Sequence, residues 1–135
     1  RYSSAASDVY KRQILGLILI ISCEQKFKLD PNINPFFQEW NTQFEVPPFL
    51  DIKNEHYMPA FKKGMEENLK EIDIIVNNTQ EPTFENTIEE LERSGKLLGK
   101  VQRVFSNLAS SNTNSQLQEL QRDLSPMLSA HYDKD

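Results

Sequence analysis

An apolar stripe with the period of a helix constrains the fold of this chain more than any other feature. From about Asn54 onward, large apolar side chains recur at steps of four, four, four, three and four residues: Tyr57, Phe61, Met65, Leu69, Ile72 and Val76. Residues with this spacing share one face of an α-helix. Asn54 is expected to cap the N-terminus of the helix, since asparagine is favoured there. The stripe predicts an amphipathic helix that ends in the turn at Asn77–Pro82.

A second helical stripe begins at Thr83, the predicted N-cap of its helix. Its apolar members are Phe84, Ile88, Leu91, Leu98, Val101, Phe105 and Leu108. Gly95 falls on the same face, and a glycine inside a helix costs about 1 kcal/mol relative to alanine. We therefore expect one helix from Thr83 to Leu108, in which Gly95 is tolerable if another helix crosses closely at that point.

A third stripe follows the polar loop Ser110–Ser115. Its inward residues are Leu117, Leu120, Leu124 and Met127. Pro126 is expected to kink or interrupt this helix, because proline lacks the amide N–H that a helix interior uses. No stretch alternates with a period of two for long enough to form a sheet. The predicted fold class is all-α, with the helices in residues 54–135.

Residues 34–53 form an aromatic, proline-rich segment ahead of these helices. Its prolines, among them Pro47 and Pro48, are incompatible with a regular helix or a central strand. Its large rings are Phe36, Phe37, Trp40, Phe44 and Phe49. So many rings favour an extended arm that packs onto a helical body, which can extend beyond this sequence. The alternative is that they form an aromatic ligand-binding cluster.

Ile14–Ile21 is an uninterrupted apolar run, too short to span a membrane, for which about 20 residues are needed. Two basic residues precede it, and Cys23, the only cysteine, follows it after a serine. This order is typical of a secretory signal, and a small residue before cysteine resembles the lipobox of bacterial lipoproteins. We interpret residues 14–23 as a lipoprotein-type signal, Cys23 as the lipidated residue that binds an envelope membrane, and residues 24–33 as a tether. The alternative is a buried strand or helix with an inert thiol.

Residues 1–13 fit such a signal poorly, because they are polar and lack an initiating methionine. We interpret them as non-native or disordered. If they are foreign, Lys11 and Arg12 say nothing about export, and the expected location changes from the bacterial cell envelope to the cytoplasm. The sequence opens at Arg1 and stops at Asp135 without the pattern of a finished domain, so we interpret the chain as a fragment.

The charge and the reactive residues argue against several function classes. With 20 acidic and 15 basic residues the formal net charge is −5, so no basic surplus is present for binding nucleic acid. The only histidines are His56 and His131, and no His-x-x-x-His pair, Cys-x-x-Cys pair or glycine-rich phosphate loop occurs. His56 is expected at a helix end or in packing. His131 is expected to bind zinc only if partner ligands lie beyond Asp135. The residues alone therefore predict no catalytic or metal site.

A series of motifs nevertheless resembles a known family. They occur in order with short spacers, at residues 34–41 (NPFFQEWN), 46–49 (VPPF), 52–57 (IKNEHY), 58–65 (MPAFKKGM), 71–73 (EID), 82–89 (PTFENTIE), 94–98 (SGKLL), 107–114 (NLASSNTN) and 128–131 (LSAH). Together they are similar to the N-terminal region of the thimet oligopeptidase family of zinc metallopeptidases. The likeness is greatest to the bacterial peptidyl-dipeptidases (dipeptidyl carboxypeptidases) and oligopeptidase A.

The resemblance implies a longer, almost wholly helical zinc enzyme that hydrolyses short peptides inside a channel, releasing C-terminal dipeptides. In that family a His-Glu-x-x-His helix and a later glutamate hold the zinc. None of those residues is present here, so the implied zinc belongs to the full-length protein alone, and no catalytic or metal-binding residue is assigned to this chain. The matched region would be part of an N-terminal helical lobe that walls the channel. The alternative is a small helical envelope lipoprotein that acts as a binding or structural module.

Overall fold

The computed structural model describes residues 29, 30 and 32–134. The interpreted segment 1–13, the signal at 14–23 with Cys23, and about half of the tether at 24–33 lie outside the described residues. Within the described part, no helix has both the length and the apolar character needed to cross a membrane.

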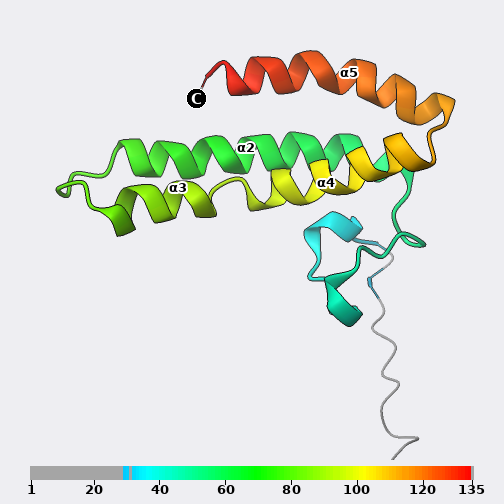
Figure 1. Cartoon of the computed structure of the whole chain (residues 1–135), viewed down its shortest axis with the longest axis horizontal. Helices are drawn as coiled ribbons and strands as arrows, with labels where there is room; N and C mark the ends of the chain where they lie inside the picture. The colour runs from blue at the N-terminus through cyan, green and yellow to red at the C-terminus, as the bar shows by residue number, and fades with distance from the viewer. Residues whose placement is uncertain (1–28, 31, 135) are drawn as a thin grey trace, which may run out of the picture.

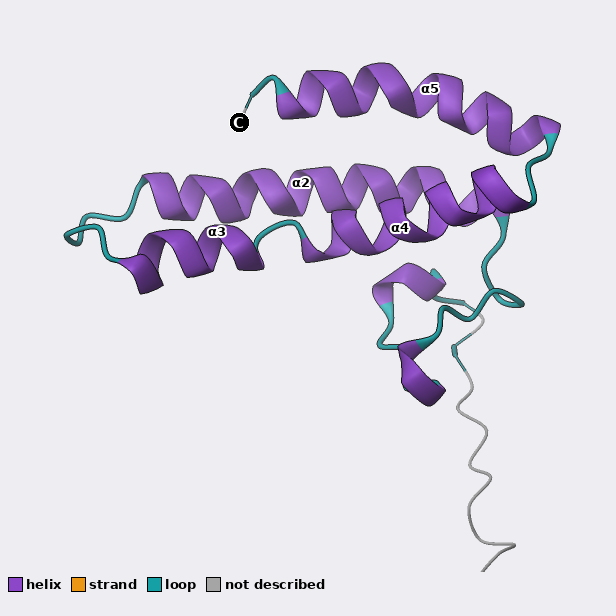
Figure 2. Ribbon diagram, viewed as in Figure 1, coloured by secondary structure: helices purple, strands orange, loops and turns teal. Residues whose placement is uncertain are grey.

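Helices make up the body of the molecule, and the described residues contain no strand, which confirms the all-α prediction (Figures 1 and 2). The α-helices are α2 (Tyr57–Val76), α3 (Glu90–Arg93), α4 (Lys96–Ser111) and α5 (Ser115–Tyr132). Three short 3-10 turns precede them, η1 (Pro35–Phe37), η2 (Gln43–Glu45) and η3 (Asn54–His56), and a π-helical segment, η4 (Phe84–Glu89), leads into α3. α2 and the α3–α4 pair form a long hairpin, α5 runs back along it, and the arm of residues 34–53 lies beside α4 (Figure 1).

The core lies where α2 meets α4, at the end nearest the arm. The Tyr57 ring packs between Phe36 of the arm and Phe105 of α4, with ring centroids 5.3 and 5.2 Å away. Phe61 meets Phe105 edge-on at 5.6 Å. The Tyr57 hydroxyl is buried without a partner among the described residues, and burial raises the pKa of Tyr57 to about 12. Arm, α2 and α4 therefore share one aromatic core.

The backbones of α2 and α4 approach each other closely at Gly64. A Cβ built on Gly64 of α2 would lie 2.9 Å from both the backbone nitrogen and the Cα of Leu98 in α4. Only a residue without a side chain permits that approach. The glycine that this backbone contact requires thus belongs to the first helix of the hairpin. α2 also passes close to Gly95, where a Cβ would lie 3.1 Å from Nδ2 of Asn68.

Gly95 instead divides the second predicted helix. Its φ of 67° is left-handed, and it separates α3 from α4. Ser94 Oγ donates a hydrogen bond to the Leu91 carbonyl (2.7 Å), and the Gly95 amide donates to Glu71 Oε2 of α2 (2.7 Å). The prediction of one helix from Thr83 to Leu108 was wrong, because the chain breaks at Gly95 and bonds to α2 there.

The predicted helix ends were right in part. Thr83 caps η4: its Oγ1 accepts from the Asn86 amide (3.1 Å), and Asn86 Oδ1 accepts from the Thr83 amide (2.8 Å). Asn54 is not the cap of α2; its side chain donates to Gln116 Oε1 (2.7 Å), and η3 precedes the helix. α5 continues through Pro126, so the proline does not interrupt it.

The apolar stripes are buried at one end of the hairpin only. Leu98, Val101, Phe105, Leu117 and Leu124 are buried as predicted. At the other end, where α2 turns into η4 and α3, several large apolar residues are exposed. This group, which we term the hairpin tip, consists of Ile74, Val76, Phe84, Ile88 and Leu91, with Val76 at 75% exposure. Four of them were expected to face inward: Val76, Phe84, Ile88 and Leu91. The described helices leave this apolar surface uncovered.

Candidate functional site

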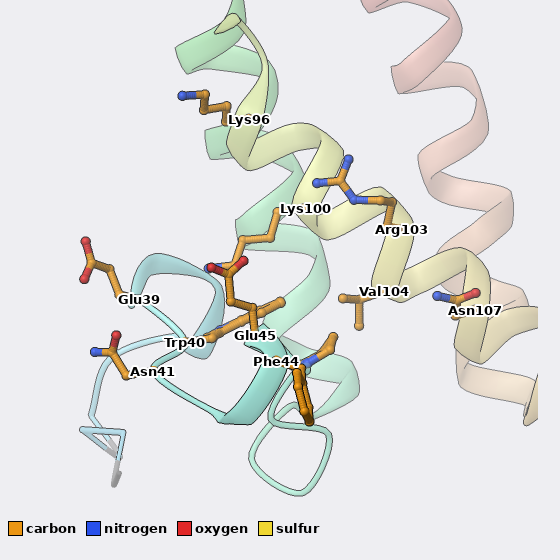
Figure 3. Close-up of a pocket in the computed structure, with 11 residues that line it drawn as sticks. Glu39, Trp40, Asn41, Phe44, Glu45, Lys96, Lys100, Arg103, Val104 and Asn107 are labelled. Carbon is orange, nitrogen blue, oxygen red and sulfur yellow. The ribbon is translucent and has the colours of Figure 1, made fainter.

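A cleft of about 710 Å³ lies between α4 and the arm, within the range of volumes that ligand pockets occupy (Figure 3). α4 supplies three basic residues to it, Lys96, Lys100 and Arg103. Their spacing of four and three residues places them on one helix face. The arm supplies two rings and two carboxylates on the other side, Trp40, Phe44, Glu39 and Glu45. Charges of both signs and exposed aromatic surface therefore meet in one cleft.

Lys100 fastens the arm to α4. Its Nζ donates to the carbonyls of Phe36 (3.2 Å) and Gln38 (2.8 Å) and lies 3.9 Å from the centroid of the Trp40 ring. Burial lowers the pKa of Lys100, opposed by the nearby carboxylate of Glu39. The ammonium group of Lys100 is thus already engaged by the arm.

Lys96 and Arg103 differ from Lys100 in this respect. Within residues 32–134, neither makes an ion pair, and neither side chain donates a hydrogen bond to another residue. Both side chains are exposed and both line the cleft. Among the described residues, nothing therefore competes with an anionic group for these two positive charges.

Phe44 sits at the mouth of the cleft in a strained conformation. Phe44 and Glu45 have φ of 60° and 54°, the left-handed region that bulky residues rarely adopt. Each such residue costs of order 1–3 kcal/mol. Thr42 Oγ1 closes the turn by donating to the Val46 carbonyl (2.6 Å). The result is a phenyl ring that is 88% exposed, unlike the anchored ring that the sequence predicts at Phe44.

The two histidines have structural contacts. His131 is 4% exposed, and its Nε2 lies 2.8 Å from Asn68 Oδ1, so Nε2 carries the proton and α5 is joined to α2. Its Nδ1 is buried without a partner among the described residues. His56 accepts from the Lys53 amide at Nδ1 (3.0 Å), just ahead of α2. This contact confirms the expectation that His56 serves a helix end.

No group of three or more His, Cys, Asp or Glu side chains in residues 29, 30 and 32–134 is arranged to hold a metal ion. A three-ligand zinc site with an open position therefore does not fit the described part of the chain. His131 has one nitrogen engaged by Asn68 and the other enclosed in the core.

Comparison with known proteins finds similar segments in two kinds of bacterial peptidase. The chain is 42% identical over 96 residues to the dipeptidyl carboxypeptidase of Escherichia coli K12. The matched segment is 71% of this chain and 14% of that protein. The chain is a partial homologue of dipeptidyl carboxypeptidase. The Salmonella typhimurium enzyme of the same name is 39% identical over 97 residues, and E. coli oligopeptidase A is 30% identical over 90 residues, or 13% of its length. These are the relatives that the sequence motifs indicate. No family model matches the chain.

Sequence reasoning missed three features of this dipeptidyl carboxypeptidase homologue. Asn68 was not singled out, although a polar residue inside the apolar stripe of α2 signals a buried hydrogen bond. The face formed by Lys96, Lys100 and Arg103 could be seen in the spacing, but its contact with the arm could not. The exposure of Phe44 had no signal, because left-handed φ at two consecutive non-glycine residues is unusual.

Proposed function

We propose that this chain is part of a longer zinc-dependent oligopeptidase that hydrolyses short peptides and releases dipeptides from their C-termini. The observation that carries the proposal is the 42% identity to dipeptidyl carboxypeptidase over 96 residues. The chain spans about a seventh of that relative's length, so the activity belongs to the longer protein.

In this proposal the chain is part of an N-terminal helical lobe and walls the channel that admits peptides. The hairpin tip supports this role. Large apolar patches on a protein surface mark places where other protein packs, and Ile74, Val76 and Phe84 are all more than half exposed here. The zinc ligands are assigned to the rest of the protein, because the described residues do not fit a zinc site. This segment therefore contributes shape and access rather than chemistry.

The anchor remains part of the proposal. The apolar run and Cys23 would attach the protein to the bacterial envelope, facing the periplasm or exterior, unless residues 1–13 are foreign and the protein is cytoplasmic. Growth with labelled palmitate tests this: we expect label on the native protein and none on Cys23→Ser. Equal labelling of the two proteins, or no label on either, would count against the anchor.

The peptidase proposal is tested on the complete reading frame. We expect it to continue into a His-Glu-x-x-His motif, and its purified product to release dipeptides from short peptides, as followed by mass spectrometry. A chelator should stop the cleavage and added zinc should restore it. A reading frame that closes natively near Asp135 would overturn the proposal and favour a helical lipoprotein module without catalysis.

A further inference from the structure

We propose that the cleft between α4 and the arm binds the C-terminal end of a short peptide, with its carboxylate on Arg103 and its last side chain against Phe44. That the ligand is a peptide rests on the proposed function. The preference for a free carboxylate rests on the cleft alone.

The basic side of the cleft is set up for a carboxylate. Lys100 is held by two carbonyls and the Trp40 ring, so it is not available. Arg103 is in no ion pair among residues 32–134, and its planar guanidinium can donate two parallel hydrogen bonds to one carboxylate. Lys96 lies seven residues earlier on the same helix and adds attraction at about 10 Å along the axis. Arg103 is therefore the residue that binds the carboxylate of the ligand.

The acidic side of the cleft decides between classes of anion. Glu39 and Glu45 lie on the arm, opposite the basic residues of α4 (Figure 3). They would repel a phosphate chain or a nucleic acid backbone, which carries negative charge along its whole length. A short peptide has a carboxylate at one end and an ammonium group at the other. Its two ends match the two sides of the cleft, and this match fixes the direction of binding.

The aromatic residues supply the apolar contact. Phe44 is held outward by two consecutive left-handed residues and by the Thr42–Val46 hydrogen bond. Strain of this kind is concentrated at ligand sites, where the surrounding structure maintains it. An apolar side chain next to the carboxylate would cover the Phe44 ring. The cleft's volume of about 710 Å³ lies within the range of small-molecule sites.

Trp40 offers a direct assay, because it is the only tryptophan in the chain and it lines the cleft. The full chain is titrated with alanyl-phenylalanine and, separately, with the same dipeptide carrying a C-terminal amide. We expect the free acid to shift the Trp40 emission saturably and the amide to bind at least about tenfold more weakly. Equal affinity for the two peptides, or the lack of a saturable shift with the free acid, would overturn the proposal.

A matched pair of variants locates the contact. Arg103→Gln should weaken binding of the free acid at least about tenfold. Arg122→Gln, the same change at an exposed arginine of α5 that has no ion pair in the described part, should leave it unchanged. Circular dichroism checks that both variants keep their helices. Equal losses from the two variants would overturn the assignment to Arg103.

The two proposals can fail separately. The binding assay uses no catalysis, so loss of the preference for the free acid would remove the cleft assignment and leave the peptidase proposal intact. If this chain binds the free acid selectively but the complete protein cleaves no peptide, the peptidase proposal fails and the cleft assignment stands.

Discussion

Replacing Gly64 by alanine tests the packing of α2 against α4. The new Cβ would lie 2.9 Å from two backbone atoms of Leu98, and neither atom can rotate away. α2 and α4 must therefore separate, which loosens the contacts of Phe61, Leu98 and Val101 in the core. Overpacking of this kind costs about 1–3 kcal/mol. The contact with backbone places Gly64→Ala in the upper part of that range.

Helix propensity opposes this cost. Alanine is favoured over glycine inside a helix by about 1 kcal/mol, so the net loss for Gly64→Ala is about 1–2 kcal/mol. For a chain of 135 residues each kcal/mol lowers the Tm by roughly 3–5 °C. Gly99→Ala is the matched control, because its Cβ would meet only the flexible end of the Arg103 side chain, at 3.3 Å. That variant should gain up to about 1 kcal/mol.

Urea denaturation followed by circular dichroism measures both variants against the parent chain. The expected result is a pair of shifts with opposite signs, and the difference between them is about 1–3 kcal/mol. A Gly64→Ala chain as stable as the parent, or an equal loss from Gly99→Ala, would show that the crossing at Gly64 is not close.

Three further changes have defined outcomes. Asn68→Ala should cost about 1–3 kcal/mol in urea denaturation, because it leaves the buried Nε2 of His131 without an acceptor; no loss would refute this pairing. The chain should bind a hydrophobic dye at the hairpin tip, and Phe84→Ser should reduce the dye fluorescence; an unchanged signal would place the dye elsewhere. The hydrogen bond from Lys70 lowers the pKa of Glu66. This pair therefore stabilises the fold at any pH above the ordinary pKa of a glutamate, and the contribution is lost as the pH falls through the lowered pKa. Glu66→Gln should remove this part of the fall in unfolding free energy at acid pH. An identical dependence of stability on pH for that variant would contradict the prediction.

Local pattern was enough to predict the helices that pack on one another. The stripe through Tyr57, Phe61 and Met65 is buried, and Thr83 caps its segment. Both depend on neighbours within a few residues along the chain. Periodicity and capping chemistry record such neighbours directly.

The errors came from contacts between distant segments. The backbone contact at Gly64, which the sequence did not indicate, depends on how α2 aligns with α4, and the stripes alone do not fix that alignment. The break at Gly95 depends on Glu71, which lies 24 residues earlier in the chain. The inward positions at Val76 and Phe84 were read correctly as apolar, but no described element covers them.

The cleft could be predicted least. The spacing of Lys96, Lys100 and Arg103 indicates one basic helix face, which is usually a solvated surface. In the structure that face becomes one side of a cleft, because Lys100 holds the arm against it through two carbonyls. A helical pattern carries no information about where an irregular, proline-rich segment will lie.

From the break at Gly95 we expect the described helices to open as two cooperative units. η4 and α3 contain no buried residue, whereas α4 buries four side chains in the aromatic core. Segments with little buried surface open at a lower free energy than the core. Amide hydrogens in residues 84–93 should therefore exchange with solvent well before those of α4, through an opening that leaves α2, α4 and the arm folded. η4 and α3 then form a separate folding unit, able to open while α2, α4 and the arm stay folded.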